Sequence, residues 1–491
     1  MTPTAADIRP PDAKQVERSD RWAMRLWVLT AATVPFSVKV YAPGMDLEVV
    51  FPAEPLLAVM FFVTLLRLAR PPRRLVTKAL QDPVVVLVLA YLCISTGTTV
   101  VSSMPMVSLK ALVVRAVYIT TLFIGPVFVF RNGSRIARKV LGAYAFAFLP
   151  IALFALSAQS QQGFMRFGAA DSAFPFYNDH THFAAALTFA LFFHCGLLWR
   201  VVHVRDPIGN IVLRSLLVSG LALALYFSFC RAAWVAVIIA MALHQTLRSW
   251  SRLRVGAAFL ALFILSLFVL RVPIAQAVQG NRSVADGAAV GTGEVIRSMS
   301  NVTNDVSNVE RLHRWKAAYA MFLERPWSGF GPATYQFHYT AFLADRDTSI
   351  APIPALRGHL NGSSMAHARN GLILRESPRV LQYSSGSAHS EYLMELTGSG
   401  LGGMVILALL ACSVLYKRFN AGRRIRDPGS RQMRSVAFLG LTAYFIHSLF
   451  NNFLDDPKVA VPFWSSLAML TFGVEAGRTE EDDSGPLSAA Q

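Results

Sequence analysis

Residues 83–103 read "PVVVLVLAYLCISTGTTVVSS", an apolar run without a charged side chain that is long enough to cross a membrane as a helix. A bilayer core about 30 Å thick needs about 20 such residues. Similar runs fill most of the chain, so we predict an all-α polytopic membrane protein with about twelve transmembrane helices. The other expected spans are residues 25–42, 52–68, 107–130, 137–158, 183–199, 211–229, 231–247, 255–272, 391–416, 435–454 and 459–475.

The composition supports a membrane protein and argues against a nucleic-acid partner. The 491 residues are 54% hydrophobic and only 15% charged, whereas soluble domains are about 25% charged. The net charge of +17 is unevenly placed: with residue 1 in the cytoplasm, more than half of the 46 Lys and Arg fall in short cytoplasmic segments. Because basic residues mark cytoplasmic loops, the charge indicates a topology with both termini cytoplasmic.

The apolar runs divide the chain into five parts. The polar start is too long and wrongly built for a cleaved signal peptide, and the four cysteines lie in or beside spans, so we expect no disulfide framework. No internal repeat is strong enough to favour an inverted-repeat transporter. We predict a cytoplasmic tail (1–24), nine transmembrane helices (25–272), a periplasmic loop domain (273–388), three further transmembrane helices (389–475) and a disordered cytoplasmic tail (476–491).

The long loop carries a predicted helix, "SNVERLHRWKAAYAMFLERP" (307–326). Ser307 and Glu310 form a capping box, and Pro326 ends the helix. Arg311 and Arg314 lie on or beside its apolar stripe, and a buried arginine requires an anionic partner; alternatively, both reach solvent or lipid phosphates. We expect the stripe to consist of Trp315, Ala318, Tyr319 and Phe322.

The next segment, "PWSGFGPATYQF" (326–337), contains two glycines that permit a tight turn and close approach of the backbone to a ligand. No Walker lysine follows Gly329 and Gly331 and no strand precedes them, which argues against a phosphate-binding loop. A structural turn is the favoured interpretation.

Several cations lie in or at the edges of apolar runs. Arg231 stands where two spans meet almost without a turn, and Lys110 and Arg115 lie in the outer half of span 107–130. Ionisable groups at such depth are functional candidates. Anchoring to lipid phosphates is the alternative, and it suits Lys110 better than Arg115.

The second sizeable outer loop reads "MRFGAADSAFPFYNDHTHFA" (165–184). Its His180 and His182 have metal-ligand spacing, but no cysteine or close set of carboxylates completes a zinc site. Asp345 and Asp347 read as solvated surface. We therefore predict no metal and no cofactor.

A histidine begins the long apolar run "SAHSEYLMELTGSGLGGM" (387–404). An imidazole at the membrane surface suits general-base chemistry near neutral pH, although a lone histidine there can also be a simple interfacial cap. Gly398 and Gly402 form a small-xxx-small pair that permits close helix packing. Glu391 and Glu395 either orient the ring or the acceptor, or cap the helix.

Four motifs together resemble the O-antigen ligase and polymerase superfamily of bacterial inner membranes. They are "RFGAADSAFPFYNDHTHFA" (166–184), "SFCRAAWVAV" (228–237), "RLHRWKAAYAMFLERPWSGFGPATYQ" (311–336) and "SAHSEYLMELTGSGLGGM" (387–404). The family pattern is a histidine often followed by Asn, a leucine four residues after the histidine, and spaced glycines. This chain has them at His389, Leu393, Gly398, Gly400 and Gly402, with Ser390 where Asn is common. The resemblance implies a GT-C-like fold with a large, partly helical periplasmic loop before the third-last span.

The resemblance also implies the reaction. A glycan on undecaprenyl diphosphate is moved to a sugar hydroxyl of lipid A–core at the periplasmic face, without metal. Because the sequence shows no convincing protein nucleophile for a double displacement, we expect a single displacement that inverts the anomeric centre. Arginine suits the diphosphate because it is always charged and can fork two hydrogen bonds onto phosphate oxygens. The expected roles are His389 as base; Arg231, Arg311 and Arg314 as diphosphate clamp; Lys110, Arg115 and Arg166 as further donor contacts; and Glu391, Glu395, Asn178, Gly329 and Gly331 in support.

Three other functions stay open. An O-antigen polymerase uses a lipid-linked glycan as acceptor, and a protein O-oligosaccharyltransferase uses a protein. Basic residues that suit the phosphates of lipid A–core favour the ligase, namely Arg357, Arg369, Arg375 and Arg379. A lipid-linked-sugar flippase needs a site near the midplane that opens to both faces, which the cations biased to one side argue against.

Overall fold

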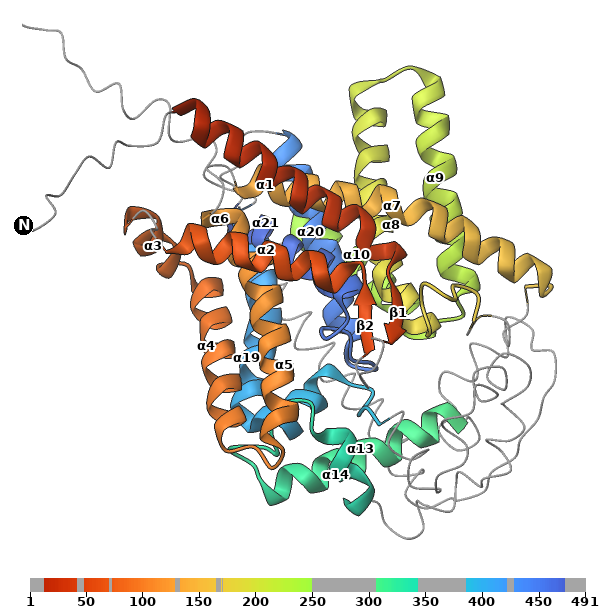
Figure 1. Ribbon diagram of the computed structural model, residues 1–491. Coiled ribbons are helices and arrows are strands. Elements are labelled where there is room, and N and C mark those ends of the chain that lie inside the picture. Colours follow the sequence, from red (N-terminus) through yellow and green to blue (C-terminus); the bar gives the residue numbers. More distant parts are fainter. Residues whose placement is uncertain are drawn as a thin grey trace, which may run out of the picture.

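A computed structural model describes residues 13–41, 48–69, 73–128, 133–164, 169, 171–249, 306–342, 386–421 and 428–472, and every structural statement below concerns these residues. They form an irregular helical bundle (Figure 1). Its α-helices are α1 (Ala13–Thr33), α2 (Ala53–Leu68), α3 (Arg73–Leu80), α4 (Pro83–Val100), α5 (Pro105–Tyr118), α6 (Gly125–Phe128), α7 (Gly133–Gln161), α8 (His180–Val204), α9 (Ile208–Phe227), α10 (Arg231–Ser249), α13 (Val306–Glu324), α14 (Tyr335–His338), α19 (Glu391–Ala421), α20 (Pro428–His447) and α21 (Pro457–Phe472).

The prediction of a polytopic, mainly α-helical membrane protein is confirmed. Within the described residues, six helical segments are long and apolar enough to cross a membrane: Pro83–Val100, Pro105–Ile124, Ile136–Gln161, His180–Val204, Ile208–Phe227 and Glu391–Arg418. The prediction of about twelve spans is not confirmed. The run 255–272 lies outside the described residues, and α1, α2, α10, α20 and α21 are too short or insufficiently apolar to count.

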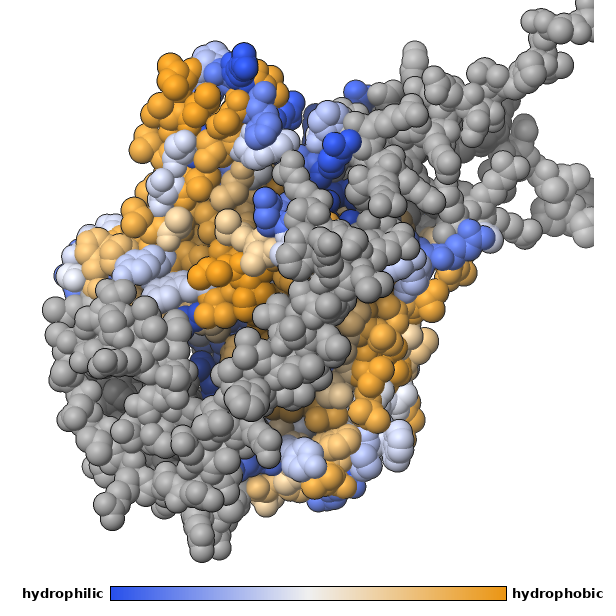
Figure 2. Space-filling view, turned by 180° about the vertical axis from the view of Figure 1, so that it is seen from behind, coloured by the Kyte–Doolittle hydropathy of each residue, from blue (hydrophilic) through white to orange (hydrophobic). Residues whose placement is uncertain are grey.

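Apolar side chains cover much of the outer surface, as Figure 2 shows for one face. On α9, Leu213, Leu216 and Leu223 are all at least half exposed. Soluble monomers rarely expose apolar patches of more than a few hundred Å². The exposed apolar surface is therefore the surface that lipid covers.

The core lies where α7, α8, α20 and α21 meet. Large aromatic side chains are fully buried there, among them Tyr144, Phe183 and Phe463. Gly440 of α20 makes room for one of them, because a Cβ atom at this position would lie 2.7 Å from the Phe189 ring.

The predicted bounds of the first span are wrong. Residues 34–41, assigned to the first span, instead form a 3₁₀ turn (Val34–Phe36) and strand β1 (Val38–Tyr41), which pairs antiparallel with β2 (Glu48–Phe51). Pro35 lies in the turn where the helix stops, and "VKVY" has the two-residue alternation of a strand.

The helix predicted in the long loop is confirmed as α13, which begins at Val306 and ends at Glu324. Its buried face is shifted from the predicted stripe. Arg314, Ala317, Ala318 and Met321 are buried, whereas Tyr319 is 58% exposed. The buried arginine of this helix is therefore Arg314, and Arg311 is half-buried.

Candidate functional site

His389 lies in the short segment 386–390 that leads into α19. Its φ of +46° is left-handed, a conformation that is uncommon for a residue other than glycine and that often marks a functional site. The His389 Nδ1 lies 3.3 Å from Asn451 Oδ1. Because an amide oxygen only accepts, this hydrogen bond places the ring proton on Nδ1 and the basic lone pair on Nε2.

Asn451 belongs to the α20–α21 loop (residues 448–456), which Glu391 holds in place. The buried Glu391 carboxylate accepts hydrogen bonds from Tyr444 Oη (3.1 Å) and from the backbone N–H groups of Phe453 (2.7 Å) and Leu454 (3.3 Å). The Glu391 N–H in turn donates to Ser448 O at 2.9 Å. Glu391 therefore fixes the loop that orients His389.

Arg115 and Glu395 form an ion pair between α5 and α19, with Arg115 Nη2 only 2.6 Å from Glu395 Oε1. Both side chains are almost completely buried. Tyr91 of α4 donates its hydroxyl to the same oxygen at 2.8 Å, and the Arg115 guanidinium lies over the Tyr91 ring. The Nε of Arg115 also lies 3.9 Å from Asp455 Oδ1 in the α20–α21 loop, so the pair connects α4, α5 and α19 to that loop.

Arg314 contacts the histidine segment directly. Its Nη1 donates to Ser387 O at 2.9 Å, and Tyr335 Oη donates to the Arg314 carbonyl at 2.8 Å. A small apolar cluster surrounds these contacts, and it includes Met321, Tyr335, Tyr339 and Ala388. Arg314 thus anchors the segment that carries His389 to α13.

Arg231 is the first residue of α10, directly after Cys230. The Cys230 Sγ lies 3.3 Å from His447 Nε2. Burial raises the pKa of the Cys230 thiol to about 12, an effect that the charge of Asp179 increases and the charge of Arg311 opposes. The Cys230–His447 contact therefore places Arg231 beside the junction of α10 and α20.

Aromatic rings connect His447, at the end of α20, to the α20–α21 loop. Phe453 contacts the His447 ring at 4.7 Å and the His182 ring at 5.1 Å between centroids. Phe450 of the same loop lies 6.3 Å from Trp315 of α13. Hence α13 and the His389 segment both contact the α20–α21 loop, and the start of α10 contacts His447 at the end of α20, directly before that loop.

The glycine-rich segment 326–334 packs against a break in α19. Gly400 has non-helical angles of φ 66° and ψ −166°, which corrects the expectation of a single continuous helix. The N–H groups of Phe330 and Gly331 donate to Thr397 O (2.8 Å) and Gly398 O (3.0 Å), carbonyls near the break. Non-helical backbone inside a membrane protein needs such partners.

Close packing explains Gly329 and Gly331 as structural residues: a Cβ at Gly329 would meet Gly398 O of α19, and one at Gly331 would meet Ser102 between α4 and α5. We expect Gly331→Ala to destabilise the protein by about 1–3 kcal/mol, because Gly331 has φ +110° and a Cβ would lie 2.0 Å from Ser102 Oγ. Gly209→Ala on α9 is the control, since nothing lies within 4 Å of its Cβ position. The measurement is thermal unfolding of both purified variants; equal melting temperatures contradict the interpretation.

The remaining predicted residues lie apart from these contacts or outside the described chain. Lys110 is exposed on α5, and Asn178 is exposed just before Asp179, the N-cap of α8. Gly402 contacts Ile94 of α4, which confirms the close packing expected of that glycine. Arg166 and the four loop arginines (Arg357, Arg369, Arg375 and Arg379) lie outside the described residues.

Sequence reasoning missed the α20–α21 loop, and it missed Asn451 and Asp455 in particular. The signal was present in "FNNFLDDP" (450–457), a cluster of amides and carboxylates between the last two apolar runs. Among the residues the structure describes, no three His, Cys, Asp or Glu side chains are arranged to hold a metal ion.

Residues 216–353 match the family model described as O-antigen ligase. The matched region contains Arg231, Arg311, Arg314, Gly329 and Gly331, and it ends before His389. No curated protein matches the chain.

Proposed function

We propose that this chain, which carries an O-antigen ligase domain over residues 216–353, transfers a glycan from undecaprenyl diphosphate to a sugar hydroxyl of lipid A–core. Its family consists of glycan-transferring enzymes that act on lipid-linked glycans, and the chain is a multi-pass membrane protein. One observation carries the proposal. Asn451 orients the His389 ring, and Arg314 of α13 binds the segment that contains His389.

His389 is the proposed base. Its Nδ1–H is directed to Asn451, so Nε2 takes the proton of the acceptor hydroxyl. The acceptor oxygen then bonds to the anomeric carbon, the bond from that carbon to the diphosphate oxygen breaks, and the electron pair leaves with the diphosphate. A single displacement of this kind inverts the anomeric centre.

Arg231 and Arg311 are the proposed diphosphate clamp. Negative charge grows on the diphosphate as the glycosidic bond breaks, and stabilising such charge is usually the largest catalytic contribution. Arg314 is assigned first to holding the His389 segment, because its Nη1 already donates to Ser387 O. Arg115 is no longer proposed to bind the glycan donor, because it forms the ion pair with Glu395. Lys110 and Arg166 are still proposed to contact the donor, at the edge of the site.

The proposed site faces the periplasm, with both termini in the cytoplasm. The clustering of Lys and Arg in alternate connecting segments supports this orientation. In Figure 1, α13 and α14 lie at the opposite end of the bundle from the tip of the α8–α9 hairpin, where the basic residues Arg200 and Arg205 lie.

A reconstitution experiment distinguishes the proposal from a polymerase of the same family. We expect purified protein, supplied with lipid-linked O-antigen and lipid A–core, to produce glycosylated lipid A–core without added metal. Elongated lipid-linked glycan in place of that product identifies a polymerase. A protein O-oligosaccharyltransferase yields neither product and instead modifies an added protein acceptor.

A further inference from the structure

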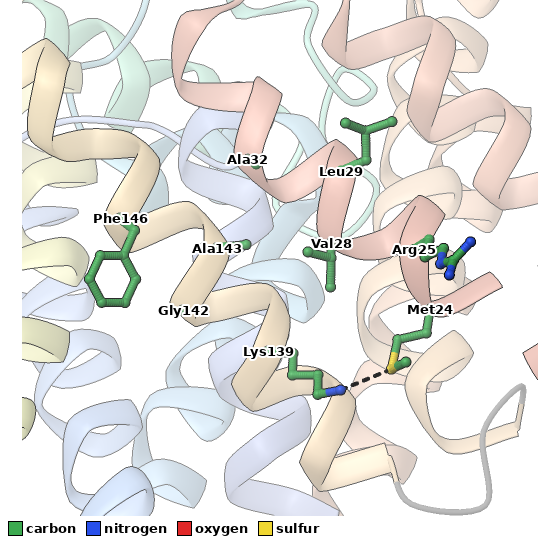
Figure 3. A pocket seen from close by; sticks show the side chains of 9 residues that line it. All are labelled: Met24, Arg25, Val28, Leu29, Ala32, Lys139, Gly142, Ala143 and Phe146. Atoms are coloured by element: carbon green, nitrogen blue, oxygen red, sulfur yellow. Dashed lines mark hydrogen bonds between the residues drawn. The ribbon is translucent and has the colours of Figure 1, made fainter. Parts of the chain in front are cut away.

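A groove between α1 and α7 lies away from these residues (Figure 3). Its volume of about 670 Å³ is in the range of small-molecule sites, which is about 300–1,000 Å³. Small side chains leave the space between the helices, and larger apolar ones border it. The lining residues are Met24, Arg25, Val28, Leu29, Ala32, Lys139, Gly142, Ala143 and Phe146.

Both charged residues of the lining are cations. Lys139 Nζ lies 3.3 Å from Met24 Sδ, and a thioether is only a weak acceptor. The Arg25 guanidinium lies over the Trp22 ring at 5.1 Å. Within the described residues neither cation has a carboxylate partner at ion-pair distance, so both can bind an added anion.

Trp22 indicates how deep in the membrane the end of the groove with Arg25 and Lys139 lies. Its side chain is 61% exposed, and exposed tryptophans concentrate at the membrane–water interface. Arg25 and Lys139 therefore lie at the depth of lipid headgroups. The remaining lining residues are apolar and extend along α1 to Ala32 and along α7 to Phe146, at the depth of acyl chains.

We propose that this groove binds one anionic phospholipid of the surrounding bilayer. Arg25 and Lys139 contact its phosphate, and one acyl chain lies along Val28, Ala32 and Ala143. The pattern of charge supports this class of ligand, because a cationic end continuing into an apolar trough is complementary to an anionic amphiphile. A bilayer phospholipid is favoured over the glycan donor because α13, the His389 segment and the α20–α21 loop all lie outside the lining.

Native mass spectrometry of the full-length protein in detergent tests the proposal, with phosphatidylglycerol and phosphatidylcholine as probes. We expect phosphatidylglycerol to bind more tightly than phosphatidylcholine. Arg25→Gln and Lys139→Gln should each weaken phosphatidylglycerol binding about fivefold, the effect of one basic residue near an anionic surface. Ala143→Phe should abolish binding of both lipids by filling the groove.

Matched controls lie on the α8–α9 hairpin. Arg200→Gln removes an exposed cation and Ala222→Phe adds an aromatic ring to an exposed position, and neither should change lipid binding. If Ala143→Phe does not fold, the two surface charge variants decide the result. Equal affinity for the two lipids, or charge variants that bind as the parent does, overturns the proposal. Displacement of phosphatidylglycerol by undecaprenyl phosphate, with transfer lost in Ala143→Phe, also overturns it and identifies a donor-chain site.

Discussion

His389→Ala should lower the rate of glycan transfer by about 10²–10⁴-fold, the usual contribution of a positioned general base. The variant should bind the lipid-linked donor as tightly as the parent, since the diphosphate is assigned to Arg231 and Arg311. Single-turnover transfer with purified protein, measured beside donor binding, separates the two effects.

His203→Ala is the matched control. His203 lies near the end of α8, where its Nδ1 contacts Trp199 O at 2.9 Å, and it has no part in the proposed site. Its loss should leave transfer unchanged. Transfer by the His389→Ala protein at the parental rate shows that another group takes the proton. A flippase is favoured by a different result, in which neither the parent nor the variant transfers glycan while both still transport the lipid-linked glycan.

Arg115→Met should produce the largest loss of stability, about 3–5 kcal/mol, because it leaves the carboxylate of Glu395 buried without its ion-pair partner. Glu395 is fully buried, and Arg115 is its ion-pair partner at 2.6 Å. Replacing both residues, as in Arg115→Met with Glu395→Leu, should recover part of that loss because no unpaired charge stays buried.

Lys110→Met serves as the control, since Lys110 is an exposed cation on the same helix. Thermal unfolding of the four proteins in one detergent gives the comparison. If Arg115→Met unfolds at the same temperature as Lys110→Met, or if the double variant is less stable than Arg115→Met alone, the ion pair does not have the structural role described here.

Local sequence patterns predicted most of the helices. Each predicted span within the described residues overlaps a helix, because a long apolar run allows little else in a bilayer. They did not predict where helices are interrupted. The α19 break at Gly400 depends on backbone hydrogen bonds from Phe330 and its neighbours, which are distant in sequence.

The sequence predicted several residues of the candidate site, but it did not predict which residues they contact. The sequence identified His389, Arg115 and Arg314 as exceptional, since each combines charge or a titratable ring with an apolar setting. It could not pair Arg115 with Glu395, which are 280 positions apart, nor His389 with Asn451. Such pairings follow from helix packing, and periodicity within one helix carries no information about its neighbours.

The central claim is that Arg231 and Arg311 hold the donor diphosphate while His389 Nε2 faces the acceptor. An experimental structure with a lipid-diphosphate-linked glycan bound tests it most directly. We predict phosphate oxygens within hydrogen-bond distance of both guanidinium groups and the first sugar beside the His389 ring. A diphosphate bound elsewhere, with both arginines and His389 out of contact, would contradict the account.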